Sequence, residues 1–244
     1  MNAMAKLLGA GMLLLATWQA FAMPPQRVQL EYDVKYSGKL NAEATATAEL
    51  VHDGKRYSLV EESRAKGLAA VLLPGVLRRS ATGTISAEGL RPDEFRDRRG
   101  NRPENLARFD WTKGELEFST EGKTETQTQT QTISERDLLS DRLSFFWTFA
   151  FRPAAILKAG SEIRAMLTDG RGLSSFRYRV AGTETLITPA GPLRAVKLVK
   201  QMETGDDRST EIWFAIERNY LPVRILVMEK DGTRVDTILT RMGV

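Results

Sequence analysis

The chain has 244 residues, of which 42% are hydrophobic and 27% are charged, and its formal net charge is +4 at pH 7. These proportions are those of an ordinary globular protein, so they exclude disordered and fibrous chains, and the mild charge predicts no nucleic-acid partner. The absence of cysteine excludes disulfide bonds, thiolate metal sites, a cysteine nucleophile and a lipid-modified N-terminal cysteine.

Residues 1–22 have the pattern of a signal peptide. Lys6 precedes an apolar run over residues 7–16, and Ala20-Phe21-Ala22 is a small-x-small triplet of the kind that signal peptidase cuts after. The run is about half of the roughly 20 residues that a membrane-spanning helix requires, so we expect no stable membrane span. A buried N-terminal helix is the alternative, but Met23-Pro24-Pro25 reads as an extended start. We therefore predict a cleaved signal peptide and a periplasmic chain over residues 23–244.

The first part of that chain reads as β-strands. Apolar and polar residues alternate over residues 28–36, which is typical of a half-buried strand. The next strand, over residues 42–50, places alanines on its apolar face. Asp53-Gly54 then predicts a two-residue turn into a third strand over residues 56–62.

The same pattern of strand, short turn and strand recurs along the chain. Turns are predicted at Lys113-Gly114, Asp169-Gly170, Arg218-Asn219 and Asp231-Gly232. Residues 124–132 alternate threonine with glutamate or glutamine, which we interpret as a solvated edge strand rather than a linker. These elements predict an all-β, mainly antiparallel protein whose sheet curls into a barrel or half-barrel, with a sandwich as the alternative.

One segment has helical spacing instead. Ser134 and Asp137 resemble a capping box, and apolar residues then recur at helical intervals until Arg152-Pro153. We predict one helix near residues 134–151. Its second half is apolar nearly all round, so we expect it to be buried against the concave face of the sheet. No long linker is visible, which leaves either one domain or two fused β halves meeting near residues 134–155.

Residues able to carry chemistry are few. His52 is the only histidine and precedes a turn, so we expect an exposed, non-catalytic side chain. No G-x-S-x-G elbow, phosphate loop, calcium loop or zinc spacing occurs. The acidic doublets Glu61-Glu62, Asp93-Glu94 and Asp206-Asp207 should point to opposite faces if they lie on strands. We expect no enzyme, metal or cofactor, and a hydrolase that uses carboxylates from different strands is the alternative.

Two further segments have competing interpretations. Six arginines and five acids alternate over residues 91–110, and we favour an internally paired surface over a site for phosphate or carboxylate groups. Residues 68–77 are mainly apolar with a Pro-Gly turn signal inside. We expect this stretch to be core rather than a mobile lid.

The alanine strand and the aromatic helix should share the concave surface. We therefore predict a binding protein without enzymatic activity that holds a lipid or other apolar ligand, or an envelope protein, between them. Alternatives are an interaction module that uses the edge strand and, less favoured, a hydrolase of envelope glycans. The candidate ligand-binding residues are Ala44, Ala46, Ala48, Phe146, Trp147 and Phe149.

Several short blocks occur in an order and spacing that carry a family resemblance. They are Gly89-Leu90-Arg91-Pro92, Asp141-Arg142-Leu143-Ser144, Thr168-Asp169-Gly170, the run over residues 178–184, Thr188-Pro189-Ala190-Gly191, Ile212-Trp213-Phe214 and Leu221-Pro222-Val223-Arg224. Together they resemble a bacterial exported family known as domain of unknown function 3108. The resemblance implies a β-rich envelope protein with a signal peptide, and it carries over neither an activity nor catalytic residues. The expected architecture is also similar to that of periplasmic lipoprotein carriers.

Overall fold

The computed structural model describes residues 23–38, 41–72, 75–120, 123–128 and 137–243. Its strands are β1 (Arg27–Ser37), β2 (Ala42–His52), β3 (Arg56–Ala65), β4 (Val76–Ser86), β5 (Gly89–Arg99), β6 (Asn105–Asp110), β7 (Glu115–Thr120), β8 (Lys123–Thr128), β9 (Asp137–Asp141), β10 (Glu162–Thr168), β11 (Leu173–Thr188), β12 (Gly191–Lys200), β13 (Arg208–Ala215), β14 (Leu221–Glu229) and β15 (Arg234–Gly243). Its helices are α1 (Gly67–Leu72), α2 (Arg142–Thr148) and the short 3-10 helices η1 (Phe149–Phe151), η2 (Ala154–Leu157) and η3 (Ile216–Arg218).

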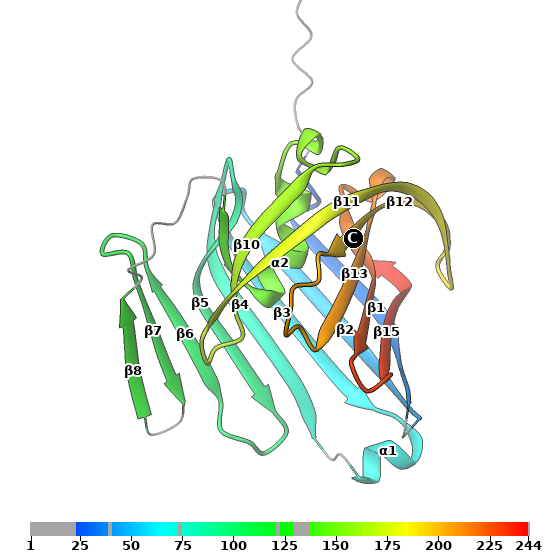
Figure 1. The fold of residues 1–244 in the computed structure, drawn as a ribbon, viewed down its shortest axis with the longest axis horizontal. Coiled ribbons are helices and arrows are strands. Elements are labelled where there is room, and N and C mark those ends of the chain that lie inside the picture. Colours follow the sequence, from blue (N-terminus) through cyan, green and yellow to red (C-terminus); the bar gives the residue numbers. More distant parts are fainter. Residues whose placement is uncertain (1–22, 39–40, 73–74, 121–122, 129–136, 244) are drawn as a thin grey trace, which may run out of the picture.

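The strands form one 15-stranded sheet in the order β8-β7-β6-β5-β4-β3-β2-β1-β15-β14-β13-β12-β11-β10-β9. Neighbouring strands are antiparallel, except that β9 runs parallel to β10. The first and last strands, β1 and β15, pair at the middle of the sheet. The sheet curls so that β1 to β5 form one wall, β10 to β14 form the other, and α2 lies between them (Figure 1). The predicted all-β curled sheet around a buried aromatic helix is therefore confirmed.

The predicted turns lie where the sequence placed them. Gly54 and Gly170 have φ values of +88° and +87°, which a residue with a side chain adopts only with strain. The turn between β13 and β14 uses Asn219 in the left-handed conformation instead, with φ of 51°. These short turns fix the register of the hairpins that form both walls.

The helix begins later than predicted. Asp137 lies in β9, and Leu139 pairs with Met166 of β10, so the predicted capping box is wrong; residues 134–136 lie outside the described residues. The helix starts instead after Asp141, whose carboxylate accepts hydrogen bonds from the backbone N–H groups of Leu143 and Ser144, both at 2.8 Å. This cap sets the start of α2, because it satisfies two N–H groups that a helix leaves without partners.

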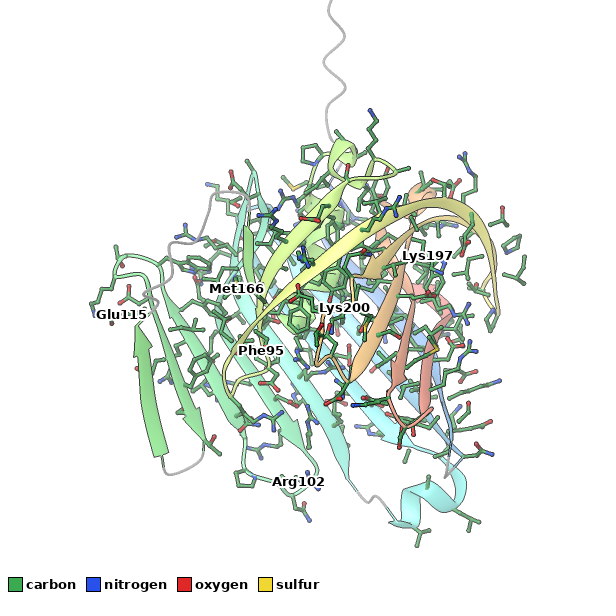
Figure 2. All side chains as sticks on the ribbon, in the orientation of Figure 1. Phe95, Arg102, Glu115, Met166, Lys197 and Lys200 are labelled. Atoms are coloured by element: carbon green, nitrogen blue, oxygen red, sulfur yellow. The ribbon has the colours of Figure 1, made fainter. Side chains whose placement is uncertain are left out.

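The helix packs on both walls, and side chains fill much of the space between them (Figure 2). Trp147 belongs to the larger apolar cluster, which is built mainly on β1 to β7. Phe145 and Phe149 belong to the second cluster, where the Phe149 ring lies 4.7 Å from that of Phe214. The helix is therefore buried on opposite sides, as its apolar sequence predicted.

The apolar stretch after β3 is not core. Leu68 and Val71 of α1 are 85% and 76% exposed, so the prediction of a core segment is wrong for them. The reason is the register of the sheet. Arg64 of β3 pairs directly with Val76 of β4, and α1 lies in the connection between these strands, outside the sheet.

Two surface predictions are confirmed for the residues that the structure describes. Strand β8 stands at one end of the sheet order, as expected for an edge strand. Four of the five arginines of β5 and β6 are paired with acids rather than gathered into an anion site, and the fifth, Arg91, lies 4.2 Å from the centre of the Trp111 ring. The ion pairs join Arg96 to Glu94 and Glu104, Arg98 to Glu104, Arg99 to Asp97, and Arg108 to Glu94 and Glu117.

Candidate functional site

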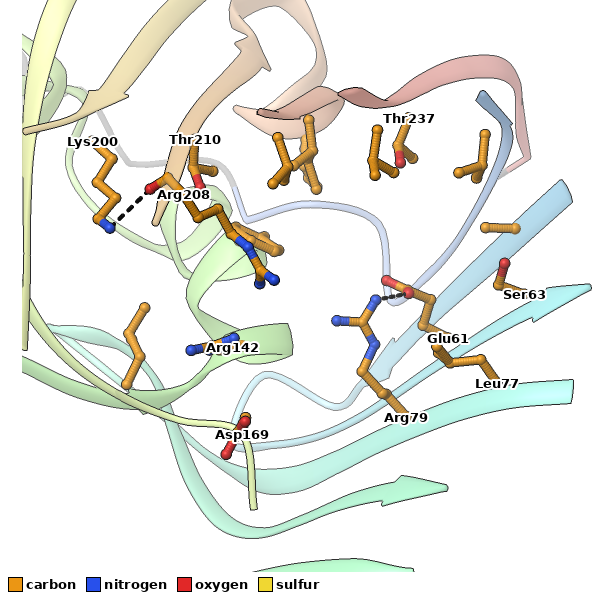
Figure 3. Close-up of a pocket in the computed structure, with 18 of the residues that line it drawn as sticks. Glu61, Ser63, Leu77, Arg79, Arg142, Asp169, Lys200, Arg208, Thr210 and Thr237 are labelled. Carbon is orange, nitrogen blue, oxygen red and sulfur yellow. Dashed lines mark hydrogen bonds and ion pairs between the residues drawn. The ribbon is translucent and has the colours of Figure 1, made fainter. Parts of the chain in front are cut away.

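A cavity of about 550 Å³ lies between the two walls beside α2 (Figure 3). This volume falls within the roughly 300–1,000 Å³ typical of small-molecule sites. Strands β1 and β2 contribute apolar and aromatic side chains, β14 and β15 contribute aliphatic side chains, and the helix contributes two aromatic rings. These residues are Tyr32, Val34, Ala46, Phe146, Trp147, Ile225, Val227 and Val235.

The structure brings three of the six predicted ligand-binding residues to this cavity. Ala46, Phe146 and Trp147 line it. Ala44 and Ala48 are buried on the same face of β2 but are not among the lining residues. Phe149 lies on the other side of the helix in the second apolar cluster, because a residue two positions after Trp147 points to a different side of a helix.

The cavity also has a polar end that the sequence reading missed. Its charged side chains come from β3, β4, α2, the turn after β10, β12, β14 and the connection into β13, so they are distant in sequence and only the curl of the sheet brings them together. The acids are Glu61, Asp169, Asp206, Asp207 and Glu229, and the bases are Arg79, Arg142, Arg171, Lys200 and Arg208. The sequence holds one signal of this polar end. Glu61 follows Tyr57 and Leu59 at alternate positions of β3, so it belongs to the inward face of that strand.

Each lining acid forms an ion pair. Glu61 pairs with Arg79 inside the cavity (Figure 3), and the other four acids bind a lysine or arginine at 2.6 to 3.6 Å. The partners are Arg171 for Asp169, Lys200 for Asp206, Lys230 for Asp207 and Arg208 for Glu229. For Asp169 and Asp206, the ion pair contributes to a pKa below the usual value.

The acidic doublets behave in two ways. Glu61 faces the cavity, whereas Glu62 pairs with Arg64 and Arg78 on the outer face, as predicted for neighbours on a strand. Asp206 and Asp207 both line the cavity, so the prediction that they diverge is wrong. They lie in the connection between β12 and β13, where the alternation of a strand does not apply.

Burial and charge set the pKa values at the polar end. Burial alone would raise the pKa of Asp169, but the hydrogen bond and charge of Arg171, together with the charge of Arg142, lower it below its usual value. Burial lowers the pKa of Arg142, opposed by the charge of Asp169. Burial, with a smaller contribution from Glu61, raises the pKa of Tyr32. The site therefore presents charged carboxylates and guanidinium groups beside a neutral tyrosine.

His52 is not the exposed residue that its position before a turn suggested. It is only 7% exposed, and its ring lies edge-on to Phe151 at 5.1 Å. The Gly54 N–H donates to Nδ1 at 3.2 Å, so Nε2 carries the proton and donates to the Pro24 carbonyl oxygen at 3.1 Å. The expectation of exposure is wrong because the segment before β1 covers this end of β2. His52 does not line the cavity.

Within the described ranges, no three metal-ligating side chains are grouped so that they could hold a metal ion. None of the helices described has the length and apolar character needed to cross a membrane.

Comparison with known families agrees with the block pattern in the sequence. Residues 31–240 match the family described as "Protein of unknown function (DUF3108)". The chain belongs to this family. A comparison with curated proteins gives no match.

Comparison with solved structures gives matches of different strength. A β-barrel-like protein of domain of unknown function DUF1849 from Brucella abortus superposes with a TM-score of 0.57 and 11% identity, over 91% of this chain and 99% of that one. A protein described as exported, with a YmcC-like fold, from Bacteroides fragilis gives a TM-score of 0.36 and 10% identity, over 89% and 95% of the chains. A protein described as a lipoprotein from Parabacteroides distasonis gives 0.38 and 8%, over 91% and 98%. This DUF3108 chain therefore shares its fold with the β-barrel-like DUF1849 protein.

Proposed function

We propose that the chain is a non-enzymatic, periplasmic binding protein that holds an apolar or amphipathic small molecule in the cavity beside α2. The observation that carries this proposal is the apolar lining, in which aromatic rings of the helix face aliphatic side chains of both walls. Burial of a ligand methylene in such a lining contributes about 0.8 kcal/mol. The pattern of residues 1–22 supports the periplasmic location.

The architecture favours an open cavity over a collapsed core. Tyr32 pairs in register with Ala46, so a large aromatic side chain of this wall lies beside a small one. The Tyr32 hydroxyl donates to the Pro222 carbonyl oxygen at 2.8 Å, which holds β1 against β14. The alanine therefore leaves space that the walls do not close.

The charged residues support binding rather than catalysis. A general acid or base needs a carboxyl group whose pKa lies near neutral pH. The lining acids are ion-paired, and the pKa of Asp206 is lowered by backbone hydrogen bonding at Glu203 and by Lys200. We therefore assign these carboxylates a structural role, in which they hold the basic side chains of the polar end in place.

Native mass spectrometry with lipid extraction tests the proposal. The chain is expressed with its own residues 1–22 and purified without detergent from the extracytoplasmic fraction, alongside an Ala46→Leu variant that fills the cavity and a Thr47→Leu control. Thr47 is exposed on the opposite face of β2, so this control places the same leucine side chain outside the site. We expect a bound lipid or other apolar molecule in the wild type and in Thr47→Leu, and much less in Ala46→Leu. A wild type that carries no small molecule and does not bind added dodecan-1-ol would overturn the proposal.

A second candidate follows from the position of β8 at the end of the sheet. An edge strand can bind a partner by adding a strand to the sheet. A Thr126→Pro substitution would remove one backbone donor from β8. If an envelope partner is captured by crosslinking, its affinity should fall in this variant, and unchanged affinity would exclude pairing at this edge.

A further inference from the structure

The polar end of the cavity has five acids and five bases, and one of these bases differs from the others in its partners. Four of the five lining bases form an ion pair with an acid. Apart from the pair of Arg79 and Glu61, the distances between nitrogen and oxygen are 2.6 to 3.0 Å. Among the residues that the structure describes, Arg142 is the lining base without an ion pair. Asp207 pairs with Lys230, which does not line the cavity, so the guanidinium of Arg142 is left without an acid of its own.

The surroundings of Arg142 hold the guanidinium at the cavity without supplying an acceptor. Its central carbon lies 5.6 Å from the centre of the Phe176 ring, and Lys200 lies over the same ring at 5.3 Å. A ring face attracts a cation but leaves the N–H groups of a guanidinium unused. Asp169 is close enough for its charge to act on Arg142, but its carboxylate is bound to Arg171 at 2.6 Å. In Figure 3 the side chain of Arg142 lies at the cavity near Asp169.

A second polar side chain, that of Tyr178, lies near Arg142. Tyr178 lines the cavity and is only 3% exposed, and its ring lies 5.1 Å from that of Phe145. The charge of Arg142 acts on this hydroxyl, but burial dominates and raises its pKa. The group therefore keeps its proton and is available as a donor. Because Tyr178 lines the cavity, a ligand head group bound near Arg142 can accept a hydrogen bond from this hydroxyl.

We infer that the ligand is a single-chain anionic amphiphile, whose carboxylate or phosphate head group binds Arg142 and the Tyr178 hydroxyl while its alkyl chain lies along Trp147 and the apolar walls. This inference rests on the proposed function, because it specifies the occupant of the same cavity. A guanidinium binds carboxylate and phosphate oxygens through paired N–H groups. A cavity of about 550 Å³ fits one molecule of this size rather than a lipid with two chains.

Binding of a matched series of twelve-carbon amphiphiles tests the inference. Dodecanoate, dodecyl phosphate, dodecan-1-ol and dodecyltrimethylammonium are titrated at neutral pH below their micelle-forming concentrations, with calorimetry as the readout. The carboxylate and phosphate probes separate the two sources of head group. The variants are Arg142→Gln, Arg142→Lys and Tyr178→Phe, with Arg179→Gln as the control. Arg179 is exposed on β11 and does not line the cavity.

We expect the wild type to prefer an anionic probe over dodecan-1-ol by at least about tenfold. Arg142→Gln should weaken the anionic probe by about 10- to 100-fold and dodecan-1-ol by less than about twofold. Tyr178→Phe, which keeps the ring, should weaken the anionic probe about threefold to tenfold. Arg142→Lys should retain part of the preference, since it keeps the charge. Arg179→Gln should bind as the wild type does.

The outcomes separate the inference from the function on which it rests. If dodecan-1-ol and the anionic probes bind the wild type equally, and Arg142→Gln changes neither, the head-group assignment is wrong while binding of an apolar ligand stands. Preference for the ammonium probe would also overturn the assignment. If none of the probes binds, the proposed function itself is wrong. Should Arg142→Gln fail to fold by near-ultraviolet circular dichroism, Tyr178→Phe and Arg142→Lys decide the result.

Discussion

The Tyr32 hydroxyl on β1 donates a 2.8 Å hydrogen bond to the Pro222 carbonyl oxygen on β14, although β15 lies between these strands in the sheet. The bond is possible because β14 pairs with β15 only from Arg224 to Met228. The carbonyl oxygen of Pro222 lies beyond that ladder, and the curl of the sheet brings Tyr32 to it. One side chain therefore connects two walls of the cavity.

Replacing Tyr32 with phenylalanine should lower the free energy of unfolding by about 1 to 2 kcal/mol. The change leaves the Pro222 carbonyl oxygen buried without this donor, and the ring still fills its place. Urea denaturation monitored by circular dichroism measures the effect. Tyr36→Phe is the matched control on the same strand, because Tyr36 is 38% exposed, and it should change stability by less than about 0.5 kcal/mol. Equal losses in both variants would show that the hydrogen bond does not stabilise the fold.

The ion pair between Glu61 and Arg79 predicts a larger effect. The two side chains are 15% and 27% exposed, so removal of one charge leaves the other largely desolvated. Glu61→Gln should therefore destabilise the protein by about 2 to 4 kcal/mol. Glu62→Gln is the control, since its partners Arg64 and Arg78 are 64% and 52% exposed, and such surface pairs contribute about 0 to 1 kcal/mol. A loss in Glu62→Gln as large as that in Glu61→Gln would contradict the assignment of Glu61 to the interior.

Much of the fold could be predicted because its signals are local. Alternation over residues 28–36 and the Asp53-Gly54 turn each depend on neighbours along the chain, and both hairpin strands appear where predicted. The start of α2 could not be placed in this way. Leu138 and Leu139 suit a helix or a strand equally, and their pairing with β10 decides between the two.

The candidate site was predictable only in its apolar half. Ala46 and Trp147 belong to segments whose patterns mark an inward face, so their meeting at a concave surface could be inferred. Arg142 and Tyr178 are brought together by the curl of the sheet, which no local pattern records. His52 illustrates the same limit, because its burial depends on Pro24, 28 residues earlier in the chain.

Because α1 is exposed, substitutions in it should have little effect on stability, although the sequence predicted a core segment there. Leu68→Ala should change the free energy of unfolding by less than about 0.5 kcal/mol, because the side chain is 85% exposed. Leu59→Ala on β3 is the comparison, since Leu59 is fully buried, and it should lose about 2 to 5 kcal/mol. Thermal unfolding of both variants measures the difference. A large loss in Leu68→Ala would mean that α1 packs as core in solution.

The buried cap of α2 predicts a dependence of stability on pH. Burial raises the pKa of Asp141 from 3.8 to about 6, against the opposing effect of its hydrogen bonds with Ser144 and Leu143. The folded state therefore holds the Asp141 proton more tightly than the unfolded state does. This stabilisation is fully present below pH 3.8 and is lost as the pH rises through about 6. The loss is about 3 kcal/mol, since one pKa unit corresponds to roughly 1.4 kcal/mol.

Asp141→Asn isolates this contribution. Asparagine keeps the oxygen that accepts from the Leu143 and Ser144 N–H groups, and it stays neutral at every pH. Other carboxylates, such as that of Asp236, have a lowered pKa and stabilise the fold as the pH rises, so the difference between wild type and variant is the informative quantity. Urea titrations at intervals from pH 4 to 7 should show the wild type losing up to about 3 kcal/mol relative to Asp141→Asn. Parallel curves for the two proteins would show that Asp141 titrates normally and is not sealed from solvent at the start of α2.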